Sequence, residues 1–336
     1  MAGGGDVVMS TVAGRAADPV ERGFPHLPTV RSAVTALYRR LSADTVDQFG
    51  VSVAPADVAF GDGNDLHLGA QRVAGALVRH LRLPQARIIV SFRSMDHAAS
   101  VELAAGPEYF VELNERFRTH RRDVGAALAH EVMHVYLHRL DLAFRGVPAN
   151  EILTDTAAAF LGSGWLLLDA FRQDGVSSQK LGYLTPEEFG YVLAKRAAVF
   201  GEDPSPWFTS PQAYEAYVAG RARARRDVER PPLAGAGRVA RRAYVRDRRW
   251  ARRWGRPAGR GALSDGEGYV FEPGGTGEPG GPPAAGAQAG ADGGAGADGM
   301  RVAFACPTCF QRLRVPVRGP VRARCGLCRS VLDCDT

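Results

Sequence analysis

The string HEVMH at residues 130–134 contains the side chains best able to do chemistry in this chain. In an α-helix, residues four apart lie on nearly the same face, about 6 Å apart along the axis. The imidazoles of His130 and His134 could therefore both bind one Zn²⁺ at about 2.0–2.1 Å. Glu131 would lie beside the metal, where its carboxylate could take a proton from a metal-bound water and pass it to a leaving group. The alternative, an ordinary amphipathic helix, is disfavoured because two histidines occur at ligand spacing.

A third ligand is expected from the next helix. Glu151 follows His134 by 17 residues, and the Gly-Val-Pro turn at residues 146–148 would return the chain antiparallel to the histidine helix. Asp155 lies four residues further on the same face, where it could accept a hydrogen bond from the second nitrogen of a ligating imidazole. Asp155 could also be the ligand in place of Glu151. His138 is not expected as a ligand, because about 12 Å of helix rise separates it from the first histidine; we expect it to be packed or to support a ligand.

These two motifs resemble those of the gluzincin metallopeptidases, which pair HExxH with a downstream ExxxD. The Asn150 that precedes Glu151 matches the NExxxD form of the thermolysin-like members, and the continuation to His138 is similar to cytoplasmic HExxH peptidases related to those that cleave phage repressors. The resemblance covers about residues 85–170 and implies a zincin-like zinc metallopeptidase. By position it implies the ligands His130, His134 and Glu151, the general base Glu131, and Asp155 as the hydrogen-bonding partner of a ligand. The downstream His or Tyr that stabilises the oxyanion in larger gluzincins has no matching position.

All five cysteines follow residue 305, and four of them form two CxxC pairs separated by 15 residues. These four are Cys306, Cys309, Cys325 and Cys328. The spacing predicts a closed, structural Cys₄ zinc site and resembles a zinc ribbon, with residues 312–317 and 321–324 forming a hairpin around Gly319 and Pro320. Metal binding should supply most of the folding free energy of so small a unit. Cys334 is left as a free thiol, although it could replace a ligand. We therefore expect two Zn²⁺ per chain, one catalytic and one structural.

Composition divides the chain into five segments. They are a disordered tail at 1–23, a globular domain at 24–220, an Arg-rich stretch at 221–260, a flexible Gly- and Pro-rich acidic linker at 261–300 and the zinc ribbon at 301–336. Apolar periodicity in the globular domain predicts helices at about 29–48, 68–83, 119–140, 149–171, 185–200 and 211–226, and strands at 87–92, 100–103 and 108–113. Strands followed by helices indicate an α+β fold. By the resemblance, Glu108–Leu113 would be the edge strand that lines the cleft; a plain structural strand is the equal alternative.

The Arg-rich stretch carries 15 Arg against three acidic residues, within a chain of net charge +6. Nucleic acid is a partner that this stretch could bind, since arginine clusters neutralise phosphates. Aromatic residues are sparse, however, and no base-reading motif is visible. We therefore favour a contact within the chain or with a protein partner, through this stretch and the ribbon, over nucleic acid. A solvated helix face is the remaining alternative.

The sequence indicates a cytoplasmic protein without membrane association. Its first residues have neither a basic start nor a sustained apolar run, and the longest apolar stretch, residues 157–168, is far shorter than the roughly 20 residues that span a bilayer. Paired cysteines at metal spacing indicate a reducing compartment. The leading hypothesis is a zinc metallopeptidase that hydrolyses a peptide or protein substrate. The alternative is a non-catalytic regulatory or adaptor protein with structural or sensing metal sites.

Overall fold

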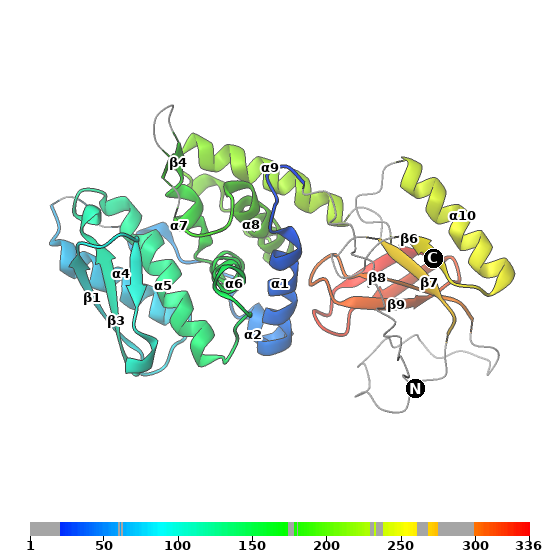
Figure 1. The fold of residues 1–336 in the computed structure, drawn as a ribbon, viewed down its shortest axis with the longest axis horizontal. Coiled ribbons are helices and arrows are strands. Elements are labelled where there is room, and N and C mark those ends of the chain that lie inside the picture. Colours follow the sequence, from blue (N-terminus) through cyan, green and yellow to red (C-terminus); the bar gives the residue numbers. More distant parts are fainter. Residues whose placement is uncertain are drawn as a thin grey trace, which may run out of the picture.

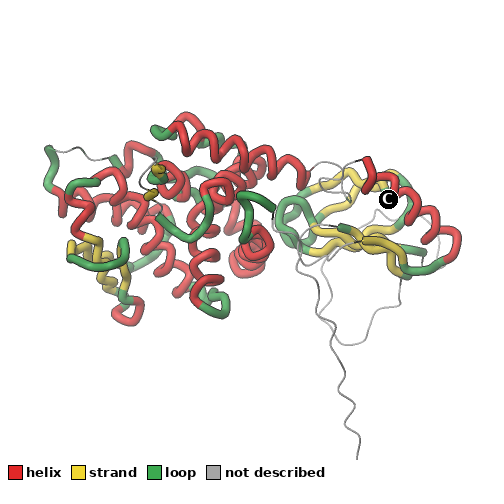
Figure 2. Tube along the Cα trace, turned by 45° about the horizontal axis from the view of Figure 1, so that its top comes forward, coloured by secondary structure: helices red, strands yellow, loops and turns green. Residues whose placement is uncertain are grey.

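Helices and strands are segregated along the chain, as Figure 1 and Figure 2 show. The structure, a computed structural model, describes residues 21–59, 61, 63–173, 178–179, 181–228, 232, 238–260, 268–274 and 299–336. We call residues 21–228 the main unit and residues 238–336 the C-terminal unit. Together they form an α+β protein, as the sequence predicts. Most of the expected tail (1–20) and most of the expected linker (261–267 and 275–298) lie outside the described residues.

The helices of the main unit surround two buried central ones. They are α1 (Leu27–Leu41), α2 (Ala43–Asp47), α3 (Pro55–Val58), α4 (Leu66–His80), α5 (Val124–Arg139), α6 (Val147–Leu161), α7 (Gly164–Asp169), α8 (Pro186–Phe200) and α9 (Pro211–Val228). The central pair is α5 and α6: α5 packs against α4, α6 and α7, while α6 also packs against α1 and α8. Because helices covered on several sides need apolar residues all round, both are buried along most of their length.

A small sheet lies beside α5. Its strands are β1 (Arg87–Arg93), β2 (Ala99–Val101) and β3 (Glu108–Asn114), in the order β1-β3-β2. Strand β3 pairs in parallel with β1 and antiparallel with β2, so it has a neighbour on each side. The expectation of an edge strand at Glu108–Leu113 is therefore wrong. The edge next to α5 belongs to β2, because the chain adds this strand outside β3 before it returns alongside β1.

The single helix expected at 149–171 is two helices. Helix α6 ends at Gly162, whose φ of 108° is left-handed and whose amide donates to Ala158 O. Glycine adopts this conformation without a Cβ clash and is a common helix stop, so the chain turns here and restarts as α7. The expected helix at 29–48 is likewise divided at Ser42, into α1 and α2.

The C-terminal unit contains more strands than the sequence predicts. A four-stranded antiparallel sheet consists of β6 (Ala258–Arg260), β7 (Tyr269–Glu272), β8 (Arg301–Ala305) and β9 (Arg312–Pro316). Helix α10 (Arg238–Trp254) packs on β6 and β7. Residues 269–272 are thus a strand and not part of a linker. The Arg-rich stretch is not one segment either, since its first part ends α9 and its second part forms α10 and β6.

The hairpin expected between residues 312–317 and 321–324 is not formed. Strand β9 pairs with β8, while β10 (Pro320–Arg324) pairs with β11 (Val331–Asp335) in a separate two-stranded sheet. Each hairpin therefore contains one CxxC pair in its turn. The two strands that flank each CxxC turn pair with each other in antiparallel register, so each pair of cysteines lies at the end of its own hairpin.

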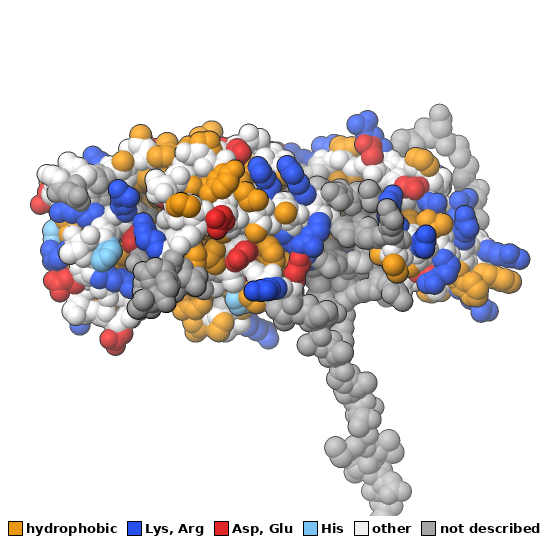
Figure 3. Space-filling model, turned by 90° about the horizontal axis from the view of Figure 1, so that it is seen from above, with side chains coloured by type: hydrophobic (Ala, Val, Ile, Leu, Met, Phe, Trp, Pro, Cys, Tyr) orange, Lys and Arg blue, Asp and Glu red, His pale blue; other side chains and the backbone are white. Residues whose placement is uncertain are grey.

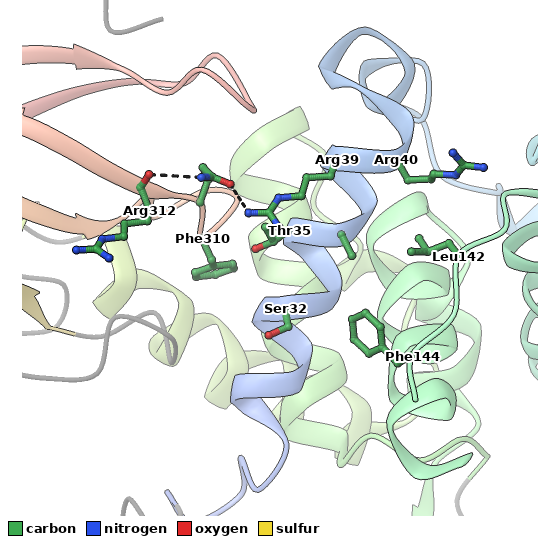
Figure 4. A pocket seen from close by; sticks show the side chains of 10 residues that line it. Ser32, Thr35, Arg39, Arg40, Leu142, Phe144, Phe310 and Arg312 are labelled. Carbon is green, nitrogen blue, oxygen red and sulfur yellow. Dashed lines mark hydrogen bonds between the residues drawn. The ribbon is translucent and has the colours of Figure 1, made fainter. Parts of the chain in front are cut away.

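The two units meet where the first CxxC turn faces α1, as Figure 4 shows. Thr35 Oγ1 donates to the carbonyl oxygen of Cys309 at 2.7 Å, and Arg39 donates to Gln311 at 2.8 Å. Between α1, the loop that contains Phe144 and the side chain of Phe310 lies a groove of about 740 Å³. The C-terminal unit is thus docked on the main unit through the residues that follow its cysteines.

A buried charge cluster underlies this contact. Lys195 of α8 donates to the carbonyl oxygen of Pro307 and lies 4.8 Å from the ring centre of Phe310. Asp227 of α9 accepts from Arg31 at 2.7 Å. Although burial opposes ionisation, Lys195 and Arg31 hold the pKa of Asp227 below its ordinary value.

Among the described residues, none of the helices combines the length and apolar character needed to cross a bilayer.

Candidate metal centres

Helices α5 and α6 bring three of the residues singled out by the sequence to one point. Nε2 of His130 lies 3.0 Å from Oε2 of Glu151 and 3.1 Å from Nε2 of His134. Nε2 of His134 lies 3.2 Å from the same carboxylate oxygen. All three side chains are partly buried. A tetrahedral site with metal–ligand bonds of 2.0–2.1 Å has its ligand atoms about 3.3 Å apart, which is close to the observed triangle.

The hydrogen bonds around the histidines direct lone pairs toward this point. His130 Nδ1 lies 2.8 Å from Oδ1 of Asp155, so it carries the proton and leaves Nε2 as an acceptor. Thr154 Oγ1 donates to the carbonyl oxygen of Asn150, so it can only accept from Nδ1 of His134, 3.3 Å away. We assign both tautomers from this network. Three acceptors at mutual distances of 3.0–3.2 Å need a cation between them.

The pKa shifts of His130 and Glu151 indicate that this site favours a bound positive charge. Burial opposes a charged imidazole, yet the hydrogen bond to Asp155 raises the pKa of His130 well above its ordinary value. Burial would raise the pKa of Glu151, but the adjacent imidazoles of His130 and His134 lower it to about 2. One proton can bridge only two of the three converging atoms, whereas a metal ion contacts all of them. The residues therefore fit a divalent cation.

Asp155 lies behind His130 rather than in the triangle. Its side chain is fully buried, and its second oxygen, Oδ2, accepts from the backbone amides of Tyr183 and Leu184. Gly182, with a φ of +90°, makes this approach feasible, because a Cβ there would lie 2.6 Å from Oδ2. The loop before α8 thus fixes the carboxylate, and the carboxylate fixes the imidazole.

Glu131 lines a cleft that opens over the triangle. The cleft encloses about 530 Å³ and is bordered by β2, α5, the start of α6 and the loop at residues 181–183. Glu131 is 7% exposed, and burial raises the pKa of its carboxyl although His130 and His134 act in the opposite direction. A carboxyl with a raised pKa beside a cation site is suited to accept and return a proton.

The structure also shows residues that the sequence did not identify. Tyr183 and His97 both line the cleft. Neither stands at a recognisable spacing from the HEVMH string, because loops bring them there, and no periodic signal could have found them. His138, expected to be packed or to support a ligand, is instead exposed near the end of α5 and lies outside the cluster.

The second cluster is formed by the four ribbon cysteines. The sulfur atoms of Cys306 and Cys328 lie 3.6 Å apart, as do those of Cys309 and Cys325. A tetrahedral zinc site with Zn–S bonds of about 2.3 Å has its sulfurs about 3.8 Å apart, so the cluster fits such an ion. Cys334 lies outside the cluster; it is buried, and burial raises the pKa of its thiol to about 11.

The two CxxC turns have the same local geometry. Phe310 donates its amide to Cys306 O at 2.9 Å, and Arg329 donates to Cys325 O at the same distance. Both residues have a left-handed backbone, with φ of 60° and 61°. The structure thus contains two groups of side chains compatible with zinc. Comparison with protein-family models, curated proteins and solved structures finds no match to this chain.

Proposed function

We propose that this protein is a zinc-dependent peptidase whose catalytic ion is held by His130, His134 and Glu151. The observation that carries the proposal is the convergence of three lone-pair acceptors beside the buried carboxyl of Glu131, at the base of a cleft. A purely structural site would be closed by a fourth side chain and has no need of a carboxyl at its side. Here the open side of the triangle faces the cleft.

Each residue then has a distinct task. The ion, when bound, would polarise a carbonyl and acidify a water molecule. Glu131 takes the proton of the attacking water and returns it to the leaving amine, and its raised pKa suits both steps. Asp155 keeps the proton of His130 on Nδ1, so that Nε2 stays a ligand.

Strand β2 offers a binding edge for an extended substrate. Within the described residues, β2 pairs only with β3, and Ala99, Ser100 and Val101 line the cleft. A peptide laid along the free edge would form backbone hydrogen bonds as an added strand. This supports a peptide as the substrate class, because the recognition uses main-chain groups.

Tyr183 and His97 are our candidates for stabilising the oxyanion. Both line the same cleft as Glu131, and a phenol O–H or imidazole N–H can donate to a developing negative charge. Removal of one such donor typically costs about 10²–10³ in turnover. Tyr183→Phe keeps the ring and the backbone amide that holds Asp155, so it tests the hydroxyl alone.

The test combines a metal count with cleavage of a peptide library by the purified protein. We expect zinc in the wild type and in Glu131→Gln, but peptide cleavage in the wild type alone. Glu115→Gln changes an exposed glutamate that does not line the cleft; it is the matched control and should cleave like the wild type. Equal cleavage by the wild type and Glu131→Gln would refute the assignment. Bound zinc with no cleavage of any peptide would instead favour the regulatory or adaptor alternative.

A further inference from the structure

Helix α10 presents a cationic face with two tryptophans. The helix contains eight arginines and one aspartate. Its inner side is held on the sheet by buried Tyr244, whose ring packs edge-to-face against Tyr269 with ring centres 4.9 Å apart. Its outer side forms an open groove of about 960 Å³. The end of the molecule that contains α10 accordingly shows basic and hydrophobic side chains together in Figure 3.

Most arginines that line this groove have no acidic partner among the described residues, whereas Arg246 pairs with the adjacent Asp247 at 3.0 Å. Arg248, on the inner flank of α10, pairs with Asp335 at 2.8 Å, and Arg312 pairs with Glu272 at 2.9 Å. In the described part of the chain, Arg242, Arg249 and Arg253 form no ion pair. No acidic side chain in the described part of the chain therefore neutralises these three charges.

The tryptophans lie beside these arginines and are half exposed. Trp250 and Trp254 are 51% and 55% exposed, with ring centres 5.8 Å apart. The guanidinium of Arg253 lies 5.3 Å from the ring centre of Trp254. Two large rings held open to solvent are stacking platforms for flat ligands, and every nucleobase has such a flat face.

Charge and shape together select one class of partner. An anionic membrane surface would require a broad apolar face on the helix, but the apolar side of α10 is turned to the sheet and arginines occupy the middle of the outer face. A duplex keeps its bases inside the stack, where the tryptophans cannot reach them. In single strands, both phosphates and base faces are accessible.

We propose that the outer face of α10 binds single-stranded nucleic acid. Phosphates contact Arg242, Arg249 and Arg253, and bases stack on Trp250 and Trp254. Arginines four residues apart on a helix, such as 249 and 253, are separated by about 6 Å of rise, so they contact successive positions of an extended backbone. Phosphate contacts and ring stacking carry no sequence information, so we expect binding without sequence preference.

The experiment measures the fluorescence anisotropy of labelled single strands of DNA and RNA, about 20 nucleotides long, with the full chain from about 50 to about 200 mM salt. The triple variant Arg242→Gln, Arg249→Gln, Arg253→Gln should weaken binding and reduce the log–log salt slope by about 2, because each phosphate contact on a single strand contributes about 0.7. The double variant Trp250→Ala, Trp254→Ala should weaken binding by about 30-fold or more, because stacking contributes about 1–3 kcal/mol per base, and should leave the slope unchanged.

A charge-matched control separates this site from general attraction to a basic protein. The triple variant Arg79→Gln, Arg122→Gln, Arg145→Gln removes the same charge from exposed positions of the main unit and should bind within twofold of the wild type. Trp250→Phe with Trp254→Phe should retain most of the affinity, which excludes misfolding as the cause of the alanine effect. Equal losses in both arginine triples, no effect of the tryptophan changes, or preferential binding to phosphatidylserine vesicles would each overturn the proposal.

Discussion

At the scale of single residues, two hydrogen bonds decide what the histidine pair can do. Asp155 and Thr154 each engage an Nδ1 atom, which leaves both Nε2 lone pairs pointing at the oxygen of Glu151. The same imidazoles in the opposite tautomer would present N–H groups and repel a cation. The candidate metal site therefore depends on residues that are not among the three proposed ligands.

The loss of zinc affinity caused by substitutions at these positions should be largest for a ligand, smaller for a residue that orients a ligand and smallest for a residue that does neither. Glu131→Gln should keep zinc, because Glu131 forms no bond to the metal. Asp155→Ala should bind zinc about 10- to 100-fold more weakly, and Glu151→Ala should lose it, since the latter removes both a bond and a charge. Zinc affinity measured by competition with a chelator gives the order.

Thr156→Val is the control for this series. The Thr156 hydroxyl is buried next to Asp155 and has no hydrogen-bond partner among the described residues. Removing it should therefore leave zinc affinity unchanged and stability unchanged or raised. If Glu151→Ala retained zinc while Asp155→Ala lost it, Asp155 would be the ligand.

At the scale of elements, the metal site depends on a loop that crosses behind it. The loop before α8 contributes two backbone amides to Asp155, and Gly182 leaves room for the carboxylate. A helix pair alone would leave this carboxylate buried without enough donors. The loop thus connects the ligand helices to α8.

Gly182→Ala should disturb the metal site through this contact. The added Cβ would lie 2.6 Å from Oδ2 of Asp155, so the loop or the carboxylate must move. We expect zinc affinity to fall about 10- to 100-fold, as for loss of a residue that orients a ligand. Zinc titration of the purified variant measures the change.

Gly201→Ala is the matched control, because it has a similar left-handed φ of +75° but open space around its Cβ. It should cost about 1–2 kcal/mol of stability from backbone strain and leave zinc affinity unchanged. Equal zinc affinities in the two variants would show that the contact with Asp155 is dispensable.

At the scale of the whole molecule, the first CxxC turn of the C-terminal unit packs against the main unit. The turn at Phe310 covers the buried cations Lys195 and Arg31, and both guanidinium and ammonium groups lie over its ring. The complex of one divalent ion with four thiolates would have a net negative charge, and this charge would complement the two cations. A left-handed φ strains the backbone of so large a residue as Phe310. The packing of its ring on the main unit accounts for a phenylalanine at this position.

Phe310→Ala should therefore destabilise the protein by about 1–2 kcal/mol, through lost apolar burial and lost cation–π contacts. Arg329→Ala, at the equivalent position of the second turn, removes only an exposed ion pair with Asp44 and should leave the free energy of unfolding nearly unchanged. Urea denaturation distinguishes the two. Equal midpoints would mean that the ribbon does not support the main unit.

The two metal centres should load independently, because different elements form them. Elemental analysis should find two zinc ions in the wild type and one in either His134→Ala or Cys309→Ser. Cys334→Ser, which changes a buried thiol outside the cluster, should retain two. A wild-type value of one that His134→Ala leaves unchanged would remove the catalytic centre from the proposal.

The sequence by itself determined the features that depend on local spacing. Helical periodicity located α4, α5 and α8 within a few residues, and the four-residue interval placed His130 and His134 on one face. The CxxC interval likewise predicted the sulfur cluster, since each pair lies within one turn. These features follow from backbone geometry that neighbouring residues set alone.

Only the tertiary structure decided the features that depend on distant contacts. Strand β2, rather than β3, forms the edge of the cleft, and β7 joins β8 across 28 intervening residues of sequence, from 273 to 300. Tyr183 lines the cleft from a loop with no periodic signal. Asp227 interacts with cationic side chains that belong to three different helices. Strand order and loop position are set by the burial of surfaces far apart in the chain, so no local pattern encodes them.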